Sequence, residues 1–187
     1  MQSENNSNQE KIIDKVIPLT GVRKLIGKRM KESLDKSPQA TGSTKIDMSG
    51  LLLLKKSFES KDVKVTYTDL LIKIVSEALK INPELNASLI DNKIIIYKSI
   101  NIGIAVAAND LLFVPVVKNV QDKSIIEISK ETKELVNKVK TGKIEPKDFS
   151  GGTFTLSNLG MHDVEVMTPI INIPEATILS VGSIKKE

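Results

Sequence analysis

The amino-acid sequence predicts an α+β fold in which helices pack on one side of a sheet. Two observations support this prediction. Segments with apolar residues at helical spacing, bounded by capping or stop residues, are interspersed with short runs of β-branched residues. The two kinds of segment do not follow a strict strand–helix–strand order. The 187 residues are enough for one domain with a hydrophobic core.

The first sixty residues are expected to hold a polar tail, two helices and a strand. Residues 1–15 are rich in Asn, Gln, Ser and Lys, which is typical of a disordered tail or the end of an interdomain linker. Residues 22–34 have apolar side chains at helical spacing, and Thr20 is a candidate N-cap. Residues 39–48 alternate loosely and predict a strand, and residues 49–60 predict a second helix.

Two further helix starts carry a capping-box pattern. In this pattern a Ser or Thr is followed three residues later by an acidic residue that reaches back to the backbone. The first opens residues 66–81 and pairs Thr66 with Asp69, and the second opens residues 124–140. Gly142 is a natural stop for the second of these helices.

Several apolar runs have strand-like composition and are separated by turn-like dipeptides. Strands are therefore expected at residues 94–97, 100–108, 111–117, 153–157 and 176–182. The near-continuous apolar character of the first three predicts strands that are covered on both faces. Pro115 predicts a bulge or a sheet edge, because proline has no N–H to donate to a neighbouring strand.

Composition excludes several classes of site. The chain has no cysteine, which rules out thiol nucleophiles, disulfides and Cys-based zinc sites. Its single histidine, His162, rules out a site with several histidine ligands from one chain, so no metal is expected. The GxGxxG, P-loop and GxSxG motifs are missing from the sequence.

Charge and hydropathy also limit the partners. No apolar run reaches the length of a membrane span, and the N-terminus does not resemble a signal peptide, so a cytoplasmic protein without a membrane partner is expected. The net charge is +4, and the densest basic stretch, residues 23–31, contains no aromatic side chain. Because base stacking needs aromatic side chains, nucleic-acid binding is the weakest of the functions considered.

Three residues invite a functional interpretation. Ser157 ends a predicted strand before a turn, so it is either a turn serine that bonds a backbone amide or a donor to a developing oxyanion. His162 is the sole imidazole, but the adjacent Asp163 cannot readily orient it, which favours a solvated surface histidine. Gly103 lies inside a predicted strand and indicates a bulge or a close approach to the backbone.

Eight segments between Ile17 and Ile184 form a recognisable series. They are IPLTGVRKLIGKRMKES (17–33), SPQAT (37–41), TDLLIKIVSEALKINPELNAS (68–88), NIGIAVA (101–107), FVPVV (113–117), IIEISKETKELVNKVKTGKI (125–144), GGTFTLSNLG (151–160) and PIINIPEATILSVG (169–182). In this order they resemble the catalytic core of the dihydrolipoamide acyltransferase component of 2-oxo acid dehydrogenase complexes.

The resemblance implies a fold, a reaction and an assembly. The fold is that of chloramphenicol acetyltransferase-like, CoA-dependent acyltransferases, a mixed sheet with helices on one side, over residues 17–187; residues 1–16 would be a linker remnant. The reaction moves an acyl group from S-acyl-dihydrolipoamide to coenzyme A, with the lipoamide supplied by a lipoyl domain outside this chain. The assembly is a homotrimer, extended to a core of 24 or 60 subunits. Its partners are the decarboxylase and dihydrolipoamide dehydrogenase components.

The resemblance also assigns catalytic roles. In the family a histidine takes the proton of the CoA thiol and a serine hydroxyl stabilises the tetrahedral oxyanion, and Ser157 falls on the serine position. The histidine lies in a DHRxxDG-type motif downstream of ILSVG (178–182), and the chain ends at Glu187 without it. Gln39 stands where many members have histidine, and Leu111 where most have glycine. We therefore expect a core that is truncated at its C-terminus and has little or no turnover, or alternatively a noncatalytic assembly module of the same complex.

Overall fold

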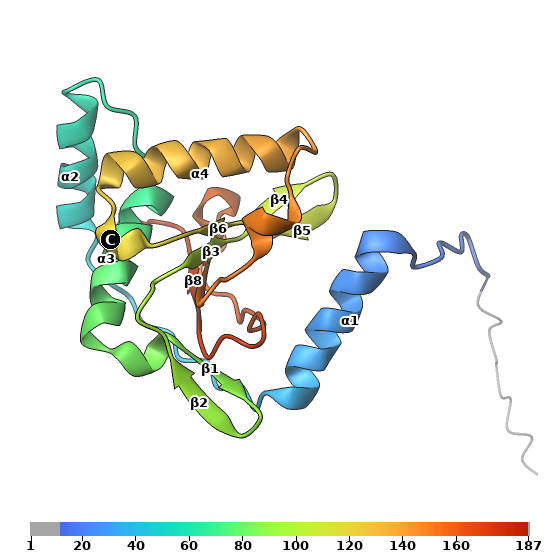
Figure 1. Ribbon diagram of the computed structural model, residues 1–187. Coiled ribbons are helices and arrows are strands. Elements are labelled where there is room, and N and C mark those ends of the chain that lie inside the picture. The colour runs from blue at the N-terminus through green and yellow to red at the C-terminus, as the bar shows by residue number, and fades with distance from the viewer. Residues whose placement is uncertain (1–11, 187) are drawn as a thin grey trace, which may run out of the picture.

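The computed structural model describes residues 12–186. A four-stranded sheet lies at the centre, with helices packed against it (Figure 1). Its strands, in spatial order, are β6 (Val116–Val117), β3 (Ile102–Ile104), β7 (Phe154–Asn158) and β8 (Ile178–Val181). β3 runs antiparallel to β6 and parallel to β7, and β7 runs parallel to β8. The sheet is therefore mixed.

Two helices cover one face of this sheet. They are α3 (Tyr67–Ile81) and α4 (Ile125–Lys140). Their apolar side chains form the core together with alternate residues of the strands: Leu71, Ile72, Val75, Leu79, Ile102, Ile104, Val117, Ile128, Leu135, Phe154 and Leu156. Because successive strand residues point to opposite faces, Thr155 and Ser157 lie on the other side of the sheet. We call the two sides the helix face and the hydroxyl face.

Both predicted capping boxes are present. Thr66 Oγ1 accepts a hydrogen bond from Asp69 N, and the Asp69 carboxylate accepts one from Thr66 N at 2.7 Å. Ser124 and Glu127 form the same pair of bonds at the start of α4. These bonds satisfy backbone N–H groups that have no partner within the helix, so each box fixes the start of a core helix.

The two N-terminal helices lie close to their predicted limits. They are α1 (Gly21–Lys36) and α2 (Ser49–Glu59). Thr20 occupies the N-cap position of α1, but its side chain makes no capping bond. α2 packs beside α3 and has no fully buried residue. α1 stands apart from the rest of the ribbon, as Figure 1 shows on its right-hand side.

The strand predicted over residues 39–48 is wrong. The structure has no strand between α1 and α2, and residues 40–47 are all exposed. Apart from Ile46, the side chains of this stretch are small or polar, so their alternation leaves little apolar surface to bury. No neighbouring strand among the described residues offers it hydrogen bonds, and without one an extended segment does not become a strand.

The apolar runs between α3 and α4 form more strands than predicted. Residues 87–96 form a hairpin of β1 (Ala87–Ile90) and β2 (Lys93–Ile96). Residues 106–113 form a second hairpin of β4 (Val106–Ala108) and β5 (Leu111–Phe113), which is joined through left-handed Asn109 and Asp110. Pro115 precedes β6, an edge strand of the main sheet, as predicted.

The prediction that these strands are covered on both faces holds for β3 and β6 of the main sheet, but not for β2, β4 and β5 in the hairpins. All three residues of β3 are buried, whereas all four of β2 are exposed, Ile94 by 74%. Within the described part of the chain, β2 pairs only with β1 and no helix covers it. Among residues 12–186, no helix is long and apolar enough to cross a membrane.

Candidate functional site

Ser157 lies near the end of β7 on the hydroxyl face. Its neighbours point the other way: Leu156 is part of the core, and Asn158 Nδ2 donates to Thr68 Oγ1 of α3 at 3.1 Å. Ser157 is 8% exposed, and its hydroxyl has no hydrogen-bond partner among residues 12–186. The hydroxyl oxygen of Ser157 is not fully enclosed by other atoms, so solvent reaches it.

The turn after Ser157 uses Asn158 for its hydrogen bonds. Asn158 Oδ1 accepts from Gly160 N at 2.9 Å, and Leu159 N donates to Val181 O at 2.9 Å. The backbone amide that a turn serine would satisfy is therefore already bonded. Of the two interpretations of Ser157, this geometry disfavours the turn serine and leaves its hydroxyl available to a ligand.

A backbone crossing closes one side of this region. A Cβ at Gly182 would lie 2.1 Å from the carbonyl oxygen of Glu165, so only glycine allows the 164–165 segment to pass there. Ser183 N donates to Val164 O at 2.8 Å and fastens the crossing. The loop that follows Ser157 is thus folded back over the end of β8.

His162 does not join this group. It lies in a short 3₁₀ turn (Gly160–His162) and is exposed. The carboxylate of Asp163 pairs with Lys185 instead of orienting the imidazole. His162 is therefore a solvated surface histidine, as favoured from the sequence.

Gly103 faces Thr155 across the β3–β7 pair, on the hydroxyl face. A Cβ at this position would lie 2.7 Å from Val114 Cγ1. The close approach predicted for Gly103 therefore comes from the side chain of Val114, at the break between β5 and β6.

Glu175 is a buried carboxyl that sequence reasoning missed. It is 5% exposed and accepts hydrogen bonds from Thr155 Oγ1 at 2.6 Å and from Asn172 Nδ2 at 3.0 Å. Burial raises the pKa of Glu175 from 4.5 to about 7; the two hydrogen bonds and the charge of Arg29 oppose this rise. A lone acidic residue in the apolar stretch from Ile170 to Val181 was the available signal, because glutamate is rarely buried.

The segment that carries Glu175 also holds α1. Arg29 Nη2 donates to Ile173 O at 3.1 Å, and Ser33 Oγ donates to Ile171 O at 2.6 Å. Gln39 Oε1 accepts from Ile171 N at 3.3 Å, which gives this residue a structural contact. We call residues 169–175 the strap, because it joins α1 to the strand that carries Ser157.

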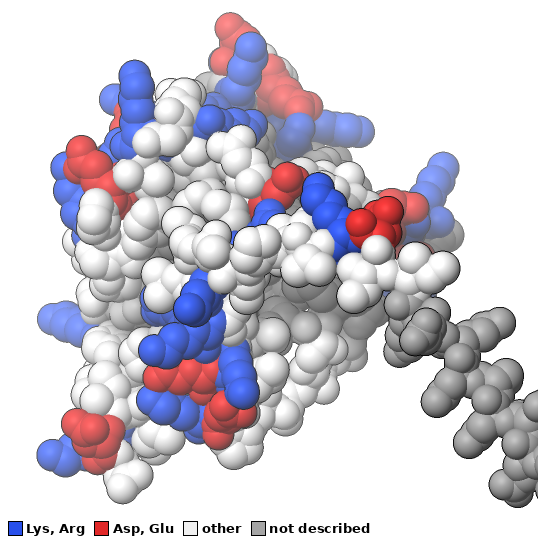
Figure 2. All heavy atoms as spheres, turned by 90° about the vertical axis from the view of Figure 1, so that its right-hand side faces the viewer, with Lys and Arg blue, Asp and Glu red and all other residues white. Residues whose placement is uncertain are grey.

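A shallow pocket of about 340 Å³ lies between α1 and the strap. Leu25, Lys28, Arg29, Glu32 and Ile173 line it. Figure 2 views the molecule from the side of α1, where basic and acidic side chains lie interspersed. This distribution does not favour nucleic acid, which binds continuous basic surfaces.

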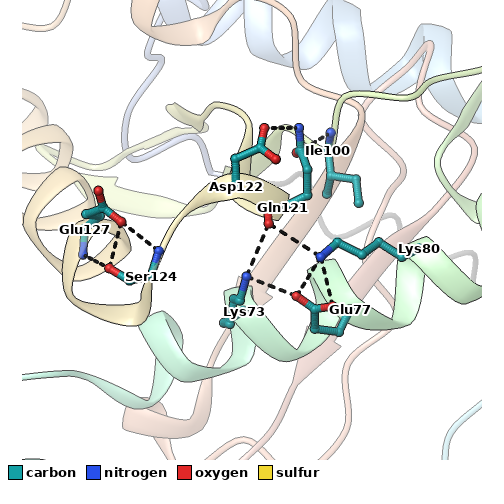
Figure 3. A network of polar contacts seen from close by, with 8 residues as sticks. All are labelled: Lys73, Glu77, Lys80, Ile100, Gln121, Asp122, Ser124 and Glu127. Carbon is teal, nitrogen blue, oxygen red and sulfur yellow. Dashed lines mark hydrogen bonds and ion pairs between the residues drawn. The ribbon is translucent and has the colours of Figure 1, made fainter.

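A polar network joins α3 to the start of the central strand β3 (Figure 3). Lys73 and Lys80 each pair with Glu77 and reach Gln121 O at 3.5 Å. Gln121 Oε1 accepts from Ile100 N at 3.0 Å. These contacts lie on the helix face and link α3 to the segment that leads into β3, so their role is structural. In residues 12–186, no three His, Cys, Asp or Glu side chains are arranged to hold a metal ion.

Comparison with known proteins gives consistent matches. The family model of 2-oxoacid dehydrogenases acyltransferase (catalytic domain) matches residues 12–187. The lipoamide acyltransferase component of the branched-chain alpha-keto acid dehydrogenase complex of Bacillus subtilis is 41% identical over 178 residues. This match covers 92% of the chain and 42% of the relative, so the chain spans less than half of that protein.

Solved structures agree over nearly the whole chain. A probable dihydrolipoamide acetyltransferase from Listeria monocytogenes superposes with a TM-score of 0.88 at 41% identity, covering 93% of this chain and 76% of that one. A second match is dihydrolipoamide acetyltransferase of Azotobacter vinelandii, which was studied for the catalytic roles of a serine, a histidine and an asparagine. It superposes with a TM-score of 0.85 at 30% sequence identity, covering 98% of this chain and 77% of that one. The cubic core of the pyruvate dehydrogenase multienzyme complex gives the same values.

Proposed function

The chain belongs to the 2-oxoacid dehydrogenase acyltransferase (catalytic domain) family, and we propose that it transfers an acyl group from S-acyl-dihydrolipoamide to coenzyme A. Its fold is that of the solved cores of these enzymes, so the expected chloramphenicol acetyltransferase-like α+β fold is confirmed. The observation that carries the proposal is the unbonded, solvent-reached hydroxyl of Ser157 at the end of β7.

The chemistry requires a donor at this position. The thiolate of CoA attacks the thioester carbon, a new C–S bond forms, and the carbonyl π electrons move onto oxygen. The resulting oxyanion collapses, which breaks the bond to the sulfur of dihydrolipoamide; that sulfur takes up a proton, leaving acyl-CoA. Ser157 donates its O–H to the oxyanion. Because the full negative charge exists only near the transition state, this bond lowers the barrier by roughly 3 kcal/mol.

We propose that the base for the CoA thiol comes from outside these 187 residues. The only histidine of the chain, His162, is exposed, and its neighbour Asp163 is paired with Lys185. Losing a general base typically lowers a rate by roughly 100- to 10,000-fold. This polypeptide alone is therefore proposed to turn over slowly.

The proposed domain organisation and partners also rest on membership of this family. Residues 17–187 are proposed as the acyltransferase catalytic core domain and residues 1–16 as part of a linker, of which residues 1–11 lie outside the described structure. A separate lipoyl domain would supply the lipoamide. The likeness to a cubic core of the pyruvate dehydrogenase complex supports a homotrimer within a larger core, with the decarboxylase and dihydrolipoamide dehydrogenase as partners. A cytoplasmic location remains a prediction from the sequence.

The test is acyl-CoA formation from S-acetyl-dihydrolipoamide and CoA, with imidazole added as an external base. Imidazole should raise the rate of the wild-type polypeptide, and Ser157→Ala should lower kcat by roughly 100-fold because the oxyanion loses a donor. Ser150→Ala is the matched control, since Ser150 lies just before β7 and its hydroxyl bonds Lys147 O. Equal rates for wild type and Ser157→Ala would refute the proposed role.

The alternative is a noncatalytic assembly module of the same complex. Exposed apolar side chains on α1 and on the β1–β2 hairpin favour it, because such surfaces mark interfaces. They include Val22, Leu25, Leu34, Leu89, Ile94 and Ile96. A stable oligomer that shows no imidazole-dependent turnover would support this alternative.

A further inference from the structure

Ser180 lies beside Ser157 on the neighbouring strand. In the parallel register of β7 and β8, Ser157 pairs with Ser180, and Leu156 pairs with Leu179. Paired residues of parallel strands point to the same side of a sheet, so both serine hydroxyls lie on the hydroxyl face. Ser180 is partly exposed.

Four hydroxyl groups lie close together on the hydroxyl face, and two of them are already bonded. Thr153 Oγ1 donates to Asn101 O at 3.2 Å, and Thr155 Oγ1 donates to Glu175 at 2.6 Å. Ser157 and Ser180 differ from these threonines: neither hydroxyl has a partner among residues 12–186, and neither oxygen is fully enclosed. The two unbonded hydroxyls therefore form an adjacent pair on this face.

The spacing of the pair suits a shared acceptor. Neighbouring strands lie about 4.8 Å apart. An oxygen that sits between two hydroxyls at this separation, about 2.8 Å from each, receives them at an angle of roughly 120°. This angle lies close to the directions of the lone pairs on an oxygen. Two adjacent strands can thus present two donors to one atom.

We propose that Ser180 is a second hydrogen-bond donor to the oxyanion, so that Ser157 and Ser180 together form a two-hydroxyl oxyanion site. This inference rests on the proposed acyl transfer. The crossing of residues 164–165 over Gly182 lies two residues beyond Ser180 and encloses the end of β8 beside the pair.

The experiment compares wild type, Ser180→Ala, Ser180→Thr and Ser157→Ala in the imidazole-supported assay with S-acetyl-dihydrolipoamide and CoA. Ser180→Ala is expected to lower kcat by roughly 10- to 100-fold, with an unchanged KM for CoA, because the lost bond exists only near the transition state. Ser180→Thr restores a hydroxyl and should recover most of the rate.

The matched control is Thr177→Val. Thr177 lies three residues away and its hydroxyl donates to Leu85 O at 2.7 Å, so the variant loses a hydroxyl near the same strand without touching the pair. Its kcat should equal that of wild type. Thermal unfolding of every variant shows whether a rate loss reflects folding.

The outcomes separate the two proposals. If Ser157→Ala lowers kcat and Ser180→Ala does not, the second donor is refuted and the acyl transfer stands. If neither substitution changes the imidazole-supported rate, or wild type shows none above the Ser157→Ala/Ser180→Ala double variant, both proposals fail. A Ser180→Ala loss that Thr177→Val shares, or that follows a lowered unfolding temperature, also counts against the second donor.

Discussion

At the scale of single residues, Asn158 and Ser157 have different roles at the same turn. Asn158 accepts from Gly160 N and donates to Thr68, so it holds the turn against α3. Ser157, one position earlier, faces the opposite side and stays unbonded within the described chain. An asparagine can make both bonds because its side-chain amide carries an acceptor oxygen and a separate donor nitrogen. Because Asn158 makes the hydrogen bonds that hold the turn, the hydroxyl of Ser157 is left free to bind a ligand.

Glu175 predicts an unusual dependence of stability on pH. Its folded-state pKa is raised to about 7 from 4.5, so the folded protein holds its proton more tightly than the unfolded chain does. The free energy of unfolding should therefore fall as the pH rises from about 4.5 to about 7, by roughly 3 kcal/mol, and then level off. Urea unfolding at a series of pH values measures this change.

Glu175→Gln is the control for this dependence. The glutamine keeps an acceptor for Thr155 but does not titrate, so the decline between pH 4.5 and 7 should disappear. Several exposed carboxyls, among them Glu77 and Glu127, have a lowered pKa, so their effect on stability falls below this pH range. The same slope in the variant and in wild type would assign the effect to other groups.

At the scale of elements, the helix starts differ in a testable way. Thr66 bonds the backbone of Asp69 at the N-cap of α3, whereas Thr20, at the N-cap of α1, makes no capping bond. Thr66→Ala should lower the free energy of unfolding by about 1 kcal/mol, and Thr20→Ala should change it by only a few tenths. Chemical unfolding of both variants measures the difference; similar losses would show that the capping bond is not the cause.

The helices and strands also show which features of the fold can be predicted from sequence patterns. The limits of α3 and α4 were predictable because capping boxes and apolar periodicity are local. The missing strand at 39–48 and the exposed β2 were not, because pairing and coverage depend on segments distant in the chain. Glu175 and the proposed role of Ser180 were missed for the same reason: Glu175 is recognised by its hydrogen bond from Thr155, and Ser180 by its register with Ser157.

At the scale of the whole molecule, much apolar surface is left uncovered by the described chain. Ile94, Ile96 and Leu89 on the β1–β2 hairpin are each more than half exposed, and so are Val16 and Ile17 before α1. Patches of this kind are rare on monomers. The polypeptide of 20.5 kDa should therefore scatter light as an oligomer, with the mass of a trimer or a multiple of it. A monomer across the accessible concentrations would contradict the proposed assembly.

The attachment of α1 to the strap has a further consequence. Arg29 and Ser33 donate to main-chain carbonyls of Ile173 and Ile171, and no side chain of the strap takes part in these bonds. Every amino acid supplies a carbonyl, so the side chains of Ile171 and Ile173 can be exchanged over evolutionary time without loss of these two bonds to the helix. The side chains of Asn172 and Glu175 in the same strap make hydrogen bonds of their own, so this freedom is confined to positions that contribute only their backbone.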